Sequence, residues 1–245
     1  MTWRSIILLV CAGAVLVVLI GLGNWQMRRL AWKEAMIERV ERGLAAPPVD
    51  IATARDLHRA GEDLEYRPAV ATGTFLHEGE AHYFATFKGR NGWFVYTPLR
   101  QSDGRILMVN RGFVEGARKD PSTRPEGQTE GEVTITGLLR TAPAEKPNPF
   151  VANNDLAKNV FHWKSLNQMA SMGTDKMEVA LEPFFLDAGP DTPTVGAGPV
   201  GGVTRVTFSN NHLGYAFTWY GLAASLVGVG LFFAFSRRNA SKRQA

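Results

Sequence analysis

The chain of 245 residues is long enough for one ordinary domain together with membrane-spanning segments, and its 20 % of charged residues is normal for a folded protein. Its single cysteine, Cys11, excludes a disulfide framework and any Cys-x-x-Cys redox or copper site. The formal net charge is only +4, and no nucleic-acid partner is expected. The mean hydropathy of −0.11 averages two very apolar ends with a polar middle.

The first apolar end predicts a transmembrane helix over residues 6–25. A cleaved signal peptide is the alternative interpretation. The small-x-small triplet at residues 12–14 lies inside the apolar run rather than after it, which favours an uncleaved anchor. Beyond the span, apolar residues at helical spacing continue to Leu44, and Pro47-Pro48 ends them. The helix is therefore expected to continue past the membrane.

The second apolar end predicts a transmembrane helix over residues 213–235, which carry no charge. A basic tail follows at residues 236–245, as is typical of a cytoplasmic flank. The basic residues after the first span suggest the opposite orientation, but a long loop is translocated largely regardless of its charges. We therefore expect residues 1–5 and the tail in the cytoplasm and residues 26–212 outside it. His212 then lies at the outer membrane boundary.

This topology predicts an integral protein of a bacterial cell inner membrane, or of the mitochondrial inner membrane in a eukaryote, with both termini on the cytoplasmic or matrix side. The outer domain is expected to be rich in strands, with a meander of three among them. The expected strands are residues 66–75, 81–87, 93–99, 105–114, 132–139, 179–188 and 203–208.

A short helix is expected over residues 158–172, and the segments 115–131 and 189–202 are expected to be loops. The predicted fold class is an α+β membrane protein. Two transmembrane helices flank a strand-rich extracytoplasmic domain with one or two short helices.

The sequence contains no phosphate-binding glycine loop and no His-Glu-x-x-His zinc motif. No serine, histidine and carboxylate have a spacing that suggests a nucleophile and its base, so we do not expect an enzyme. Met169, Met172 and Met177 have the soft sulfur that copper prefers, but at helical spacing they favour a place in the core.

Residues 23–33, 92–99, 109–114 and 210–222 are four stretches with distinctive motifs. They resemble motifs of the Surfeit locus protein 1 family. The first is the Gly-x-Trp-Gln-x-x-Arg signature that closes the first span, and the others are two strand motifs and a second-span signature. The matching residues include Gly23, Trp25, Gln26, Arg28, Asn110, Arg111, Gly112, Asn211 and Gly221. Two residues depart from the family pattern, Phe113 and Glu115, and both are expected to change only a surface detail.

This resemblance implies an assembly factor for haem-copper cytochrome c oxidase that binds haem a transiently and helps its insertion into subunit I. Haem a synthase is a second expected partner. The alternative function is a membrane scaffold that stabilises nascent subunit I without binding haem.

His212 is the candidate ligand of the haem iron, because iron in haem accepts imidazole and the porphyrin packs on apolar and aromatic surface. Tyr215 and Trp219 fall within about 60° of His212 around the helix. Trp25 and Gln26 lie at the same membrane depth. The alternative interpretation is that His212 is only a polar residue at the membrane boundary, and that Trp25 and Gln26 anchor the first span there.

The remaining histidines, His58, His77, His82 and His162, are expected to be structural or solvated. Arg111 could contact a haem propionate, or an acid within the fold, which the sequence favours. Gly112 is expected to permit a bulge or a close approach of backbone.

Gly214, Gly221, Ser225 and Gly228 form a seam of small residues opposite His212 on the second span. Small residues let helices approach closely, so the first span is expected to occupy this seam. His212 would then face an open flank. The alternative is that another protein occupies the seam and that haem lies between the two spans.

Overall fold

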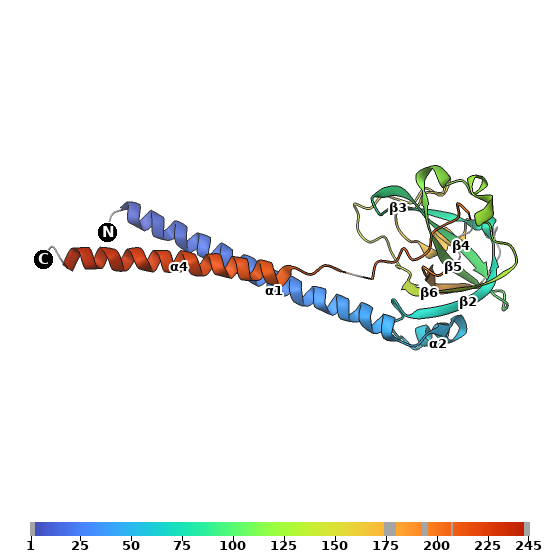
Figure 1. The fold of residues 1–245 in the computed structure, drawn as a ribbon, viewed down its shortest axis with the longest axis horizontal. Helices are drawn as coiled ribbons and strands as arrows, with labels where there is room; N and C mark the ends of the chain where they lie inside the picture. Colours follow the sequence, from blue (N-terminus) through green and yellow to red (C-terminus); the bar gives the residue numbers. More distant parts are fainter. Residues whose placement is uncertain (1–2, 174–179, 193–195, 207, 243–245) are drawn as a thin grey trace. The chain divides into compact units, whose positions relative to one another are not determined.

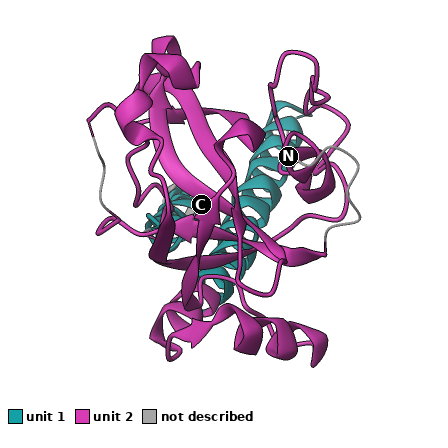
Figure 2. Ribbon diagram, turned by 90° about the vertical axis from the view of Figure 1, so that its right-hand side faces the viewer, with its two compact units in different colours: residues 1–38, 207–245 teal, residues 39–206 magenta. Residues whose placement is uncertain are grey.

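The computed structural model describes residues 3–173, 180–192, 196–206 and 208–242 (Figure 1). Met177 lies outside the described residues. The chain divides into two compact units, one made of Met1–Glu38 with Thr207–Ala245 and the other of Arg39–Val206 (Figure 2).

The first unit consists of two helices. Helix α1 (Trp3–Ala45) continues without a break past the apolar run, which confirms the expected extension of the first helix. Helix α4 (His212–Lys242) begins at His212. Both are long and apolar enough to cross a membrane when judged by length and composition, with mean hydropathies of 3.0 and 1.6 over their most apolar windows.

The second unit is built on a seven-stranded sheet in the order β1-β2-β6-β7-β5-β4-β3, and an additional pairing joins β2 to β4. This pairing closes five of the strands into a small barrel. Five-stranded, partly open barrels are the architecture of OB-folds, a likeness that concerns fold and not function. The strands are β1 (Val49–Asp50), β2 (Pro68–Phe75), β3 (Ala81–Phe87), β4 (Arg90–Arg100), β5 (Ile106–Glu115), β6 (Glu132–Thr141) and β7 (Leu181–Ala188).

Two short α-helices accompany the described strands, α2 (Ile51–Arg59) and α3 (Leu166–Ala170), in agreement with the expected fold class. The carboxylate of Asp50 accepts a hydrogen bond from the amide of Thr53 at 2.7 Å and so caps α2. Single turns of 3-10 helix are η1 (His77–Gly79), η2 (Gly116–Arg118), η3 (Pro121–Thr123) and η4 (Pro125–Gly127).

The expected meander is confirmed by β3, β4 and β5, which pair in antiparallel order. Its first turn consists of Lys88 and Gly89, which both have positive φ, at 49° and 78°. Positive φ at both central residues is the conformation of a two-residue hairpin turn that matches the twist of the strands.

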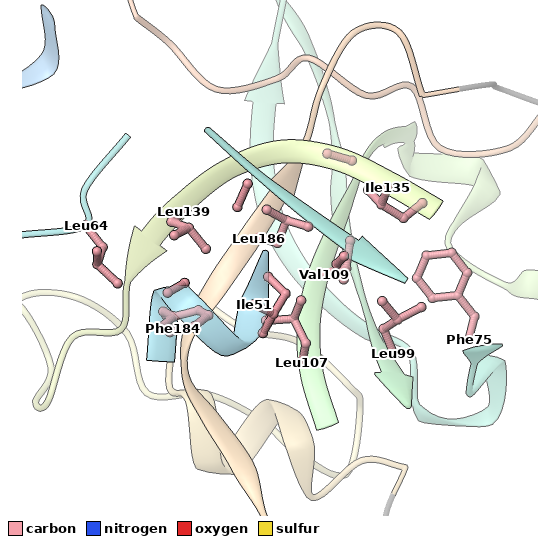
Figure 3. Close-up of a cluster of buried hydrophobic side chains, with 14 residues drawn as sticks. Ile51, Leu64, Phe75, Leu99, Leu107, Val109, Ile135, Leu139, Phe184 and Leu186 are labelled. Atoms are coloured by element: carbon pink, nitrogen blue, oxygen red, sulfur yellow. The ribbon is translucent and has the colours of Figure 1, made fainter. Parts of the chain in front are cut away.

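Side chains from the barrel strands and α2 point toward one another in the interior (Figure 3). Strand β5 is buried on both faces: Leu107 and Val109 join this interior cluster, whereas Ile106 and Met108 join a second cluster with Met169 of α3. This explains the continuous apolar run in β5, because a strand buried on both faces has no polar side. Met169 is therefore a core residue, as expected.

One expected element is wrong, and another is shorter than expected. Residues 203–206 and 208 do not form a strand, since β7 already has β5 and β6 as neighbours and leaves no free edge. The helix expected over 158–172 is limited to α3, because Phe161 pairs with Tyr83 at the edge of β3 and keeps the preceding chain extended. The segment 115–131, expected as a loop, starts with the last residue of β5 and contains η2, η3 and η4.

Candidate functional site

His212, the first residue of α4, lies against Gln26 of α1. Its Nδ1 atom is 2.8 Å from Oε1 of Gln26, and the Gln26 side chain is buried. An amide oxygen can only accept a hydrogen bond, so Nδ1 of the imidazole carries the proton and donates. In the neutral form of the ring, the second nitrogen, Nε2, then has its lone pair free.

The hydrogen bond belongs to a regular seam between the two helices. The least exposed positions recur at alternating intervals of four and three residues, as in a coiled coil. In α1 the series is Ala12, Leu16, Leu19, Gly23, Gln26, Leu30 and Lys33, and in α4 it is His212, Ala216, Trp219, Ala223 and Leu226; Leu22 and Tyr220, each one residue away from the series, are half-buried as well.

A second contact fixes the register of the helices next to His212. The phenolic hydroxyl of Tyr220 donates to Oδ1 of Asn24 at 2.8 Å. The Tyr220 ring lies directly over Gly23, where an added Cβ would be only 2.5 Å from it. A side chain at position 23 would separate the helices, which gives a physical reason for glycine in this motif.

The predicted site residues are therefore only partly assembled. His212, Gln26 and Trp219 lie on the seam, whereas Trp25 and Tyr215 are 50 % and 56 % exposed. The backbone carbonyl of Asn211 accepts a hydrogen bond from the amide of Tyr215. Arg28 is exposed on α1.

The expectation that the small-residue seam packs on the first span is wrong. A Cβ added to Gly214, Gly221 or Gly228 would meet nothing within 4 Å, whereas Ala216 and Ala223 on the His212 face are buried. The reason is that the closest approach is made by Gly23 of α1 beneath a ring of α4. His212 consequently faces its partner helix.

The other motif residues lie in the barrel unit. Asn110 is buried, and its amide donates to Oδ1 of Asp187 at 3.0 Å while its oxygen accepts from the amide of Gly112 at 3.1 Å. Burial raises the pKa of Asp187, but the charges of Lys164 and Arg140 and hydrogen bonds from Thr204 and Asn110 outweigh it, so the pKa is lowered. Asn110 thus joins β5 to β7.

Arg111 contacts an acid within the fold, the alternative that the sequence favours. Its Nη1 atom is 3.4 Å from Oε1 of Glu80, and its guanidinium lies 4.7 Å from the centre of the Phe75 ring. Burial lowers the pKa of Arg111 to about 10, which leaves it charged at neutral pH. Arg111 occupies the bulge expected beside Gly112, because Val95 pairs with Gly112 and Tyr96 with Asn110.

Glu80 is the centre of a buried ionic cluster that sequence reasoning missed. Arg124, which is fully buried, pairs with its carboxylate, and His77 and His82 lie 3.8 and 3.6 Å from it. Burial raises the pKa of Glu80, but hydrogen bonds from these histidines and the charge of Arg124 lower it by more. The net pKa is below its ordinary value, so the group stays ionised. No spacing rule points to Glu80 and Arg124, because they are far apart in sequence.

The four remaining histidines lie outside the helix pair. His58 is exposed, His77 is hydrogen bonded to the carbonyl of Thr129 at 2.8 Å, His82 is buried and His162 is half-buried. Within the part of the chain that the structure describes, no group of three His, Cys, Asp or Glu side chains could hold a metal ion.

Phe113 corrects the expectation for the two departures from the family motifs. It is buried rather than on the surface, and its ring packs against Phe87 and Phe94. Glu115 is exposed and pairs with Arg90.

Comparison with known proteins places these features in one family. The model of the SURF1 family matches residues 13–224. Surfeit locus protein 1 of Homo sapiens is 37 % identical over 223 residues, which cover 84 % of this chain and 70 % of that protein. Surfeit locus protein 1 of Xenopus tropicalis is 36 % identical over 221 residues, covering 83 % and 68 %, and the SURF1-like protein of Drosophila melanogaster is 34 % identical over 223, covering 84 % and 70 %. The chain belongs to the SURF1 family.

Proposed function

We propose that this protein is an assembly factor for haem-copper cytochrome c oxidase that binds haem a transiently and helps its insertion into subunit I. Membership of the SURF1 family supports the assembly role. The observation that supports haem binding is the hydrogen bond from His212 to Gln26.

His212 has the arrangement of a metal-binding histidine. Such histidines almost always donate their second ring N–H to a neighbouring acceptor, which fixes the tautomer and the ring orientation. The Oε1 atom of Gln26 supplies that acceptor, leaving Nε2 of His212 to bind the iron. Trp219 lies on the same seam, and the exposed rings of Tyr215, close to His212 in sequence, and of Trp25, next to Gln26, add aromatic surface. These rings offer area for a porphyrin.

The role proposed for the protein is transfer rather than catalysis. It receives haem a, for which haem a synthase is the proposed source, holds it through His212, and releases it to subunit I. An integral membrane protein with both termini on the cytoplasmic or matrix side would hold the haem near the outer surface of the membrane.

Haem content of the purified protein tests this proposal. We expect full-length protein from cells that make haem a to show a Soret absorption band, and His212→Ala to lose most of it at an unchanged protein level. The matched control is His58→Ala, which removes an exposed imidazole from the barrel unit. Equal haem content in wild type and both variants would refute His212 as ligand.

The same hydrogen bond also favours a second candidate function. A polar pair between two apolar helices can also have a purely structural role, in which it holds the helices together. In that case the protein would be a scaffold that stabilises nascent subunit I without haem. The scaffold predicts that His212→Ala lowers the amount of subunit I in the membrane although no variant differs in haem content.

A further inference from the structure

A cleft of about 730 Å³ lies at the end of β5 in the barrel unit. This volume is within the range of roughly 300–1,000 Å³ that is usual for sites of small molecules. It shares no residue with the helix pair of His212. The lining residues are Phe87, Lys88, Arg90, Phe113, Val114, Glu115, Arg118, Gly196, Ala197, Gly198 and Val200.

Gly112 of the family motif allows one wall of this cleft to form. It has a φ of 124°, and an added Cβ would be only 1.9 Å from the carbonyl oxygen of Val200. Phe113 and Val200 exchange two backbone hydrogen bonds of 2.9 and 3.0 Å. Gly127 makes a similar close approach, since its added Cβ would be 2.7 Å from Cα of Gly198. These glycines let residues 196–200 lie directly against the barrel.

The side chains of the cleft are predominantly cationic. Its one carboxylate, Glu115, already pairs with Arg90. Lys88 and Arg118 have no carboxylate partner among the described residues. Glu126 lies beside the cleft at Gly196, where an added Cβ would be 2.9 Å from the Cβ of Glu126. The cations of the cleft nevertheless outnumber these two carboxylates.

The wall formed by residues 196–200 adds hydrogen-bond donors. The amides of Gly196 and Ala197 donate no hydrogen bond within the described part of the chain. Gly196 has a positive φ of 57°. Successive free backbone N–H groups with such a residue favour the binding of anions.

Apolar surface completes the cleft. The rings of Phe87 and Phe113 lie with their centres 5.5 Å apart, and Gly196 and Gly198 add no side chain. We propose that the cleft binds an organic anion whose apolar body packs on these phenylalanines. Its carboxylate or phosphate is held by Lys88, Arg118 and the amides of residues 196 and 197. This assigns to Gly112 the role of positioning an anion site.

Calorimetric titration of the full-length protein in a neutral detergent tests the proposal. The probes are 2-naphthoate and 2-naphthyl phosphate, with dihexanoyl phosphatidate to distinguish a lipid headgroup from a free small anion. We expect 2-naphthoate or 2-naphthyl phosphate to bind, and uncharged 2-naphthalenemethanol to bind at least about tenfold more weakly, as expected for the loss of charge-assisted hydrogen bonds. Equal binding of the alcohol, or no binding of any anion, would overturn the proposal.

Variants locate the site. Lys88→Gln and Arg118→Gln should each weaken binding about tenfold, whereas Arg100→Gln, which changes an exposed arginine at the end of β4, should leave it unchanged. Gly112→Ala should abolish binding, with circular dichroism as the check on folding. His212→Ala should bind the probes normally, which separates this site from the proposed haem site. Unchanged affinity in both Lys88→Gln and Arg118→Gln would refute the assignment.

Discussion

At the scale of single residues, the acceptor that faces His212 is a neutral amide. Carboxylates, carbonyl groups and water are the usual partners of metal-binding histidines, and an amide oxygen can accept the same hydrogen bond. The oxygen of Gln26 accepts from the ring without adding charge, and the Gln26 side chain is buried. The two residues therefore act as one unit.

We predict that Gln26→Ala lowers the affinity for haem about 10- to 100-fold, the usual effect of removing the partner of a metal-binding histidine. Titration of the purified apoprotein with haem measures it. The matched control is Asn24→Ala, two residues before Gln26. It removes the hydrogen bond between Asn24 and Tyr220 and leaves His212 paired with Gln26. Equal losses in the two variants would show that helix packing, and not the orientation of His212, is being measured.

Glu80 predicts an acid-dependent stability of the barrel unit. Its pKa in the folded protein is below its ordinary value of 4.5, so the unfolded chain binds the proton more readily. The stabilisation is thus fully present above that pH and declines as the pH falls below it. Thermal unfolding as a function of pH should show this decline in the wild type and a smaller one in Glu80→Gln.

At neutral pH we expect Glu80→Gln to lower the free energy of unfolding by about 3–5 kcal/mol, because Arg124 is left as a buried charge without its partner. Glu78→Gln, which changes an exposed carboxylate two residues away, should have little effect. A Glu80→Gln protein as stable as the wild type would contradict the assigned role of the cluster.

At the scale of elements, sequence patterns predicted the turns and strands that depend on residues close together in the chain. The turn at Lys88-Gly89 and the strands on either side of it follow from positive φ and alternation of side chains. Helix α2 was not predicted, because nine residues give only a short periodic pattern. The strand expected over 203–208 failed for a non-local reason, since β7, the strand before it in the chain, is already paired on both sides.

The candidate site shows the same division. His212 and Gln26 were singled out by motif, but the face of α4 that packs on α1 was not, because it depends on Gly23 and Tyr220 meeting across two distant helices. Helix periodicity defined two opposite faces of α4 and could not say which one has a neighbour. Glu80 and Arg124 form their ion pair only through the fold.

The helix pair predicts that only one of two nearby glycines is sensitive to substitution. Gly23→Ala should destabilise the packing of α1 and α4 by about 1–3 kcal/mol, since its Cβ would meet the Tyr220 ring at 2.5 Å. Gly21→Ala is the matched control, because its Cβ would meet nothing within 4 Å. Disulfide crosslinking between cysteines at positions 26 and 212, in a background without Cys11, reports the packing.

A second substitution, Tyr220→Ala, tests whether the effect of Gly23→Ala is steric. In a Tyr220→Ala background the obstacle is gone, so Gly23→Ala should then have little further effect on crosslinking. An equal loss with and without the Tyr220 ring would contradict the close contact.

At the scale of the whole molecule, the position of the termini decides on which side of the membrane the barrel unit works. The uncharged run of α4 followed by a basic tail predicts that the tail is cytoplasmic, and an even number of spans then places the first residues on the same side.

A reporter enzyme that is active only outside the cytoplasm should be silent when fused after Ala245. The same reporter should be active when inserted after Phe150, whose side chain is 98 % exposed. Position 127 is unsuitable for insertion, since Gly127 is packed against Gly198. A fluorescent protein that matures only in the cytoplasm is the complementary control and should fluoresce after Ala245 alone. The reverse pattern would place the barrel unit in the cytoplasm and His212 at the inner membrane boundary, and would exclude the proposed transfer of haem at the outer surface.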